Sequence, residues 1–138
     1  MSQQPVGSAS EFLKITPNLV VDDVERSTAF YRDVLGFSVF MTVPGQAPFA
    51  FVWLRRGSVD VFLNDATGVG ELDPALAGRP RGGSFTMDVL VTAVDDLYAQ
   101  VGSRAKVVEA IHTQPYGMRE FVVQDPDGYL ITLAAEQR

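Results

Sequence analysis

The decapeptide QDPDGYLITL, residues Gln124–Leu133, contains the strongest structural signal in the chain. Its segment Asp125-Pro126-Asp127-Gly128 has the composition of a tight turn. Pro126 restricts φ, Gly128 tolerates positive φ, and the aspartate side chains accept hydrogen bonds from nearby backbone amides. An alternating apolar run precedes this turn and a second follows it, so the stretch predicts a β-hairpin.

The residues around this hairpin predict the same order of elements twice. The second half predicts a strand at 84–91, a helix at 94–101 and strands at 106–110, 118–124 and 129–135. The first half predicts a strand at 13–21, a helix from 22 or 23 to about 35, and strands at 37–43, 49–56 and 59–64. Gly36 ends the first helix, and Pro17 indicates an edge strand or a bulge. The pattern is therefore a repeated βαβββ unit, although the two halves share little sequence identity.

The segment between the halves, 66–83, is rich in Gly, Pro and Asp and reads as a linker. Residues 1–12 are polar and predict a disordered leader. The chain is then a single domain over 13–136, with one module at about 13–65 and the other at about 84–136.

The composition is that of a globular protein. Apolar residues make up 46% of the 138 residues, charged residues 20%, and cysteine is absent, so disulfide and thiolate chemistry are excluded. The formal charge of −6 disfavours nucleic acid as a partner and suits a cationic one. Neither a membrane span nor a signal peptide is recognisable, and we expect a cytoplasmic protein without membrane partners.

Three segments together resemble the vicinal oxygen chelate superfamily, which includes glyoxalase I, extradiol dioxygenases and bleomycin-resistance proteins. They are VDDVERSTAFYRDVLGF at 21–37, VDDLYAQV at 94–101 and QPYGMREFVVQDPDGYLITL at 114–133. The resemblance covers roughly 13–136. It implies an α+β fold in which two βαβββ modules form a curled mixed sheet around a cleft, with the helices outside. It also implies a homodimer.

Metal-using members of that superfamily carry His, Gln or Glu on the first and last strands of each module. Matching the motifs places Thr16, Phe62, Thr86 and Thr132 at those positions. These side chains form no ligand set for zinc, nickel or iron, and a shifted register does not restore one, because His112 is the only histidine. We therefore predict that the protein uses no metal and no other cofactor.

Several other residues are candidates for binding a ligand in the cleft. Asp60 and Asp88 share a strand face with Phe62 and Thr86, and either recognise a cationic ligand, hold magnesium or calcium, or pair with the protein's own arginines. Phe62 and Trp53 are expected to line the pocket, where Trp53 stacks on a planar ligand, although an aromatic row also suits a core. The remaining predicted ligand-binding residues are Asn18, Tyr116, Glu120 and Thr132.

Three functions follow from these residues. The leading hypothesis is a metal-free protein that sequesters a small organic molecule, cationic or aromatic, such as an antibiotic or secondary metabolite. The alternative is a metal-independent isomerase, lyase or cyclase. His112 is then the weak candidate for a catalytic base, together with Asp60, Asp88 or Glu120. A metal-dependent glyoxalase or dioxygenase is the least favoured, because the four ligand positions lack suitable side chains.

Overall fold

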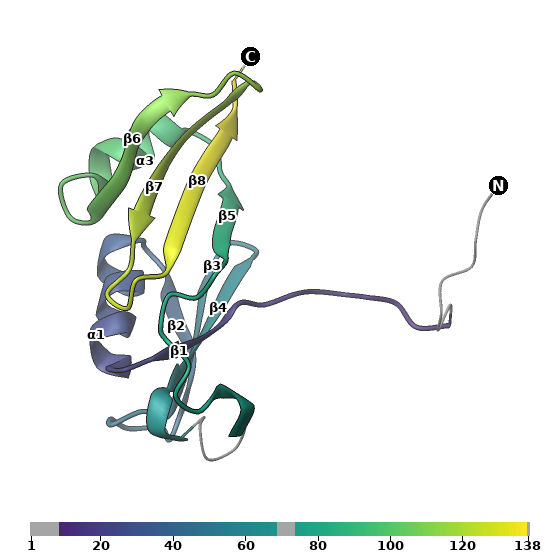
Figure 1. The fold of residues 1–138 in the computed structure, drawn as a ribbon, viewed down its shortest axis with the longest axis vertical. Coiled ribbons are helices and arrows are strands. Elements are labelled where there is room, and N and C mark those ends of the chain that lie inside the picture. Colours follow the sequence, from purple (N-terminus) through teal and green to yellow (C-terminus); the bar gives the residue numbers. More distant parts are fainter. Residues whose placement is uncertain (1–8, 69–73, 138) are drawn as a thin grey trace.

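Two separate four-stranded sheets make up the protein in the computed structural model, which describes residues 9–68 and 74–137. The strand orders are β1-β4-β3-β2 and β5-β8-β7-β6. Figure 1 shows the sheets following one another along the long axis, with α1 and α3 on the same side of them. This α+β arrangement confirms the predicted fold class, and the two sheets do not join into a closed barrel.

The first module contains one helical segment and four strands. Its elements are β1 (Asn18–Val21), α1 (Val24–Ala29), η1 (Phe30–Val34), β2 (Ser38–Val43), β3 (Phe51–Arg56) and β4 (Val59–Asp65). Asp23 caps α1, since its carboxylate accepts a hydrogen bond from the amide of Arg26 at 3.0 Å. The helix continues into η1, a π-helical turn, and ends before Gly36, whose φ of 75° suits only glycine well.

The second module repeats the order as β5 (Thr86–Leu90), α3 (Val94–Val101), β6 (Lys106–Thr113), β7 (Met118–Gln124) and β8 (Leu130–Glu136). In each module the first strand pairs in parallel with the last, and the other pairs are antiparallel. The repeated βαβββ order predicted from the sequence is thus confirmed. In the described part of the linker, residues 66–68 are helical and Pro74–Leu76 form a short 3-10 helix, η2.

The predicted strand at 13–21 is wrong over its first half, because β1 begins at Asn18. Pro17 has no amide hydrogen to donate to a neighbouring strand. Its carbonyl oxygen accepts a hydrogen bond from the amide of Phe62 in β4 at 2.9 Å, just before the β1–β4 pairing begins. Residues 10–16 form an extended arm without a strand partner, which leaves the body in Figure 1. Of the predicted leader, residues 1–8 lie outside the described residues.

Alternation along the strands divides each sheet into a helix-facing side and an open side. The helix-facing side chains of the strands pack against residues of α1, η1 and α3 to form the core. Its most deeply buried members, each at most 1% exposed, include Leu19, Val21, Val52, Leu54, Leu63, Phe121 and Val123 from the strands, and Tyr31 and Val101 from the helical segments. The open side carries the polar and aromatic residues discussed below. Within the part of the chain that the structure describes, no helix is long and apolar enough to cross a bilayer.

The turn at 125–128 has the predicted conformation and also joins the two modules. Gly128 has a φ of 95°, and Asp125 accepts hydrogen bonds from the amides of Asp127 and Tyr129, both at 2.9 Å. Asp127 accepts hydrogen bonds from the Ser27 hydroxyl at 3.0 Å and the Asp22 amide at 3.1 Å, both in the first module. The turn therefore attaches the second module to the start of α1.

Candidate functional site

The open side of the first sheet carries four aromatic rings, which we call the aromatic face: Phe40, Phe51, Trp53 and Phe62. The ring centroids of Trp53 lie 4.5 Å from those of Phe40 and 5.3 Å from those of Phe62, and the Phe51 and Phe62 centroids are 5.1 Å apart. Trp53 and Phe62 are cross-strand partners, so their side chains emerge on the same side. Phe40 is 53% exposed. Phe51, Trp53 and Phe62 are half-buried, and neither α1 nor α3 covers this side.

One end of the aromatic face carries a cluster of three charged side chains. Asp60 accepts a hydrogen bond from Arg55 Nε at 2.8 Å and another from Lys14 Nζ. The Arg55 guanidinium also lies over the Phe40 ring at 4.2 Å and the Trp53 ring at 5.3 Å, while Lys14 Nζ lies 5.8 Å from the Trp53 centroid. The Asp60 side chain is 1% exposed. Its carboxylate is thus paired with the protein's own cations, which was one of the alternatives for this residue.

The other end of the aromatic face is polar and uncharged. Asn18 is the register partner of Phe62 across the β1–β4 pair, and its amide oxygen accepts a hydrogen bond from the Asn64 side chain. The predicted ligand-binding residues Asn18, Trp53, Asp60 and Phe62 therefore lie together on one side of one sheet.

The open side of the second sheet carries the other predicted residues. Asp88 lies opposite Thr132, and Glu120 lies opposite Ala134, on the neighbouring pair of strands. Thr132 and Glu120 are each 8% exposed, whereas Asp88 is exposed. Asp88 and Glu120 thus place two carboxylates on the second sheet, which is separate from the aromatic face.

Glu120 is held by two side chains from the loop that follows β6. Its Oε1 accepts hydrogen bonds from the Tyr116 hydroxyl at 2.5 Å and from Gln114 Nε2 at 2.8 Å. The bond to the carboxylate raises the pKa of Tyr116 to about 12. His112 is the register partner of Glu120 and pairs with Glu109, with Nε2 and Oε1 3.2 Å apart. A hydrogen bond to the Ala110 carbonyl raises the pKa of His112 above its usual value.

The residues at the four expected metal positions do not fit a metal. Thr16 lies in the arm, Phe62 in β4, Thr86 in β5 and Thr132 in β8, and none has an imidazole, carboxylate or thiolate. Among residues 9–68 and 74–137, no three His, Asp or Glu side chains are grouped so that they could hold an ion. That the protein works without a metal stays a prediction. The chemistry of the side chains at the four family positions supports it.

A large groove of about 1720 Å³ runs between the two modules. It is lined by the base of the arm, the start of β4 and the whole of β5, and it includes Thr16, Asp60, Thr86 and Asp88. Trp53, Phe62, Tyr116 and Glu120 do not line it. The structure thus distributes the predicted site over the groove and the two open sheet sides.

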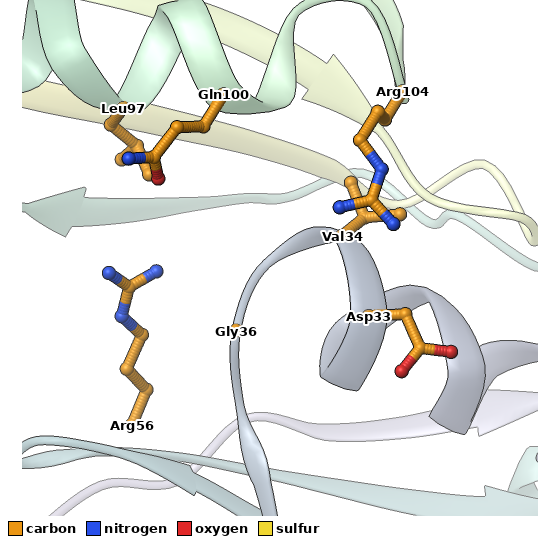
Figure 2. A pocket seen from close by; sticks show the side chains of 7 residues that line it. All are labelled: Asp33, Val34, Gly36, Arg56, Leu97, Gln100 and Arg104. Atoms are coloured by element: carbon orange, nitrogen blue, oxygen red, sulfur yellow. The ribbon is translucent and has the colours of Figure 1, made fainter.

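A second hollow of about 490 Å³ lies where the end of η1 meets α3 and the β3–β4 turn, as Figure 2 shows. Arg56 and Arg104 point toward it from opposite ends, and Gln100 lies beside Leu97 near the Arg56 end. The Arg56 guanidinium donates a hydrogen bond to the Leu35 carbonyl at 2.7 Å, which ties the β3–β4 turn to the end of the first helix.

The sequence reasoning missed Arg55, Lys14, Phe40 and Asn64 as members of the site. Arg55 could have been found, because it stands two residues after Trp53 and so shares its strand face. Lys14 is 46 residues from Asp60 and has no local signal of that contact.

The comparison with protein families finds one match. The sequence model described as "Glyoxalase/Bleomycin resistance protein/Dioxygenase superfamily" matches residues 13–133. No curated protein matches this sequence significantly.

Solved structures share the fold at low sequence identity. A glyoxalase/bleomycin resistance protein/dioxygenase from Nocardioides is 21% identical with a TM-score of 0.75, covering 94% of this chain and 86% of its own. TioX from Micromonospora sp. ML1 is 20% identical with a TM-score of 0.70, covering 91% and 99%. A lactoylglutathione lyase from Agrobacterium tumefaciens is 22% identical with a TM-score of 0.65, covering 89% and 92%. At these identities the likeness extends to the fold alone.

Proposed function

The chain belongs to the glyoxalase/bleomycin resistance protein/dioxygenase superfamily, and on that premise we propose that it binds a small planar organic molecule on its aromatic face and sequesters it unchanged. An antibiotic or a secondary metabolite produced or met by the cell is the kind of ligand that this proposal implies. Such a protein acts by stoichiometric binding in the cytoplasm and needs no metal.

The observation that carries this proposal is the position of Trp53. Its ring stands between those of Phe40 and Phe62, on the side of the sheet away from α1 and α3. Phe40 is 53% exposed and the other three rings are half-buried, so the aromatic face is only partly in contact with water. Apolar patches that reach the surface usually mark a binding surface, because burying a large apolar side chain contributes about 1.5–3 kcal/mol. The indole Nε1 of Trp53 is buried and has no hydrogen-bond partner among the described residues.

The proposal is tested by measuring binding and turnover on the same samples. Trp53 is the only tryptophan, so its fluorescence reports on this face directly. We expect naphthylacetamide, a neutral planar probe, to change this fluorescence saturably at one equivalent, and to be recovered unchanged by mass spectrometry.

Phe40→Ala should weaken binding of the probe by about tenfold or more, since roughly 1.4 kcal/mol of lost contact corresponds to that factor. Val108→Ala is the control, because Val108 is 50% exposed and lies in β6, outside both the aromatic face and the groove. Equal losses in both variants, or no fluorescence change at all, would reject the aromatic face as the binding site.

The cluster around Glu120 supports the second candidate, a metal-independent isomerase, lyase or cyclase. His112 with a raised pKa could donate a proton near neutral pH, and Glu120 lies opposite it on β7. This candidate requires that His112→Ala abolishes conversion of a bound compound while binding is retained. Recovery of every bound compound unchanged decides for sequestration.

We also propose that the protein works as a homodimer. Phe12, Leu13 and Ile15 in the arm are 100%, 86% and 93% exposed. Three adjacent apolar side chains in water favour association with a complementary surface. A second copy supplies one, because the groove beside the base of the arm contains apolar side chains such as Val61, Val89 and Leu133.

A further inference from the structure

We propose that the ligand of the aromatic face is an anion, a planar ring that carries a carboxylate or a comparable acidic group. This inference rests on the proposed function and names the charge of its ligand. It opposes the expectation from the overall charge of −6, which suits a cationic ligand.

The first reason is the charge that a ligand meets at the end of the aromatic face. Lys14 and Arg55 contribute two positive charges and Asp60 one negative charge, which leaves one positive charge in the cluster. The side chains of Lys14 and Arg55 are 43% and 40% exposed, whereas that of Asp60 is 1% exposed. The carboxylate is hidden beneath the cations, and an incoming molecule contacts the ammonium and the guanidinium.

The second reason is that the protein already occupies its own cation–π positions. Arg55 lies 4.2 Å from the Phe40 centroid and 5.3 Å from that of Trp53, and Lys14 lies 5.8 Å from that of Trp53. A cationic ligand would have to displace these groups from the rings or approach them against like-charge repulsion. An anionic ligand can lie against the remaining ring surface and leave them in place.

The third reason is that donors remain for an acidic group. Arg55 donates to Asp60 from Nε at 2.8 Å and from Nη2 at 3.3 Å. Its third nitrogen, Nη1, makes no hydrogen bond to residues 9–68 and 74–137. Lys14 has three ammonium hydrogens, and its bond to Asp60 uses one of them. Charge-assisted hydrogen bonds from such donors to a carboxylate are roughly twice as strong as neutral ones.

The overall negative charge does not outweigh these local groups. At physiological ionic strength, charges more than about 8 Å apart are largely screened. Asp88, Glu109 and Glu120 belong to the other sheet, and the far end of the aromatic face carries the uncharged amides of Asn18 and Asn64. The ligand's acidic group is therefore expected at the Lys14–Arg55 end.

The test uses three naphthyl probes that differ in charge: naphthylacetate, naphthylacetamide and naphthylmethylammonium. Their affinities are measured by Trp53 fluorescence and calorimetry on the full chain. We expect the anion to bind about tenfold more tightly than the neutral amide, and the cation to bind most weakly. Lys14→Gln should remove most of the advantage of the anion over the neutral amide. The control Lys106→Gln, on the second sheet, should change neither.

Two results would overturn the inference. If the cation binds more tightly than the anion, or Lys14→Gln leaves the preference for the anion unchanged, the charge cluster does not select the ligand, although the proposed function stands. If none of the three probes binds, the proposed function itself fails and this inference fails with it.

Discussion

The Tyr31 hydroxyl donates a 2.7 Å hydrogen bond to Oδ2 of Asp125, across 94 residues of sequence. Tyr31 lies in η1 of the first module and is 1% exposed, and Asp125 begins the turn before β8 and is 4% exposed. Burial raises the pKa of the Asp125 carboxyl, while hydrogen bonds from Tyr31 and from the amides of Tyr129 and Asp127 act against that rise. The contact thus joins the two modules through a buried carboxyl group. The hydrogen-bond donors around it favour its ionised form, which burial disfavours.

Replacing Tyr31 with Phe should destabilise the protein by about 1–3 kcal/mol. The ring and its packing are retained, but the buried Asp125 carboxyl group loses a hydrogen-bond donor. Chemical denaturation followed by circular dichroism measures this change in the free energy of unfolding. Tyr98→Phe is the control, since the Tyr98 ring packs on Phe121 and no hydrogen bond of its hydroxyl is found in the described chain. Similar losses in the two variants would show that the Tyr31–Asp125 bond is unimportant.

The Tyr116–Glu120 pair should be visible in the titration of the tyrosine. Its pKa of about 12 arises first from the hydrogen bond to the Glu120 carboxylate, so Glu120→Gln should return it toward the ordinary value of 10. Because the folded pKa is the higher one, the pair stabilises the fold below about pH 10, and that contribution is lost as the pH rises toward 12. NMR titration of the Tyr116 ring, assigned with Tyr116→Phe, measures the shift. An unchanged pKa in Glu120→Gln contradicts the contact.

The purified protein should contain no stoichiometric nickel, zinc, iron or manganese, even after incubation with each ion. The reason is chemical, since Thr16, Phe62, Thr86 and Thr132 offer no strong ligand at the family positions. Elemental analysis after gel filtration decides this. One equivalent of bound metal would contradict this prediction. The candidate ligands would then be Asp60, Asp88, His112 and Glu120, and substituting each in turn would show which of them binds the metal.

The arm should decide the oligomeric state. Changing Phe12, Leu13 and Ile15 together to Ser should weaken a dimer by more than tenfold, since each buried apolar side chain contributes about 1.5–3 kcal/mol and roughly 1.4 kcal/mol corresponds to tenfold. Sedimentation equilibrium measures the dissociation constant. Val108→Ser, a change to a half-exposed residue of β6, serves as the control. A wild-type chain that stays monomeric at high concentration would refute the dimer.

The order of elements could be predicted because its signals are local. Alternating apolar residues mark β7 and β8, Asp23 and Gly36 mark the ends of the first helical segment, and the glycine at 128 meets the need for positive φ. The helix at 94–101 and the strand at 118–124 agree with the structure residue by residue. The strand at 13–21 failed because a strand needs a partner, and residues 10–16 have none within the described part of the chain.

The candidate site was predictable only in part. The alternation of Phe51 and Trp53 placed both side chains on one strand face, but it could not say whether that face was core or surface. The answer depended on α1 and α3, which lie together on the opposite side of the sheets in Figure 1. For the same reason the sequence left open whether Asp60 would meet a ligand or an arginine.

The sequence by itself determined the family, the repeated βαβββ order, the turn at 125–128 and the lack of metal-binding side chains at the family positions. Each depends on residue type and on spacing along a few residues. The tertiary structure alone decided that Lys14 and Arg55 cover the Asp60 carboxylate and the aromatic rings, and that the turn's aspartates hold α1. These contacts join residues from separate elements. Their strength depends on the distance between the groups in space, which cannot be read from their spacing along the chain.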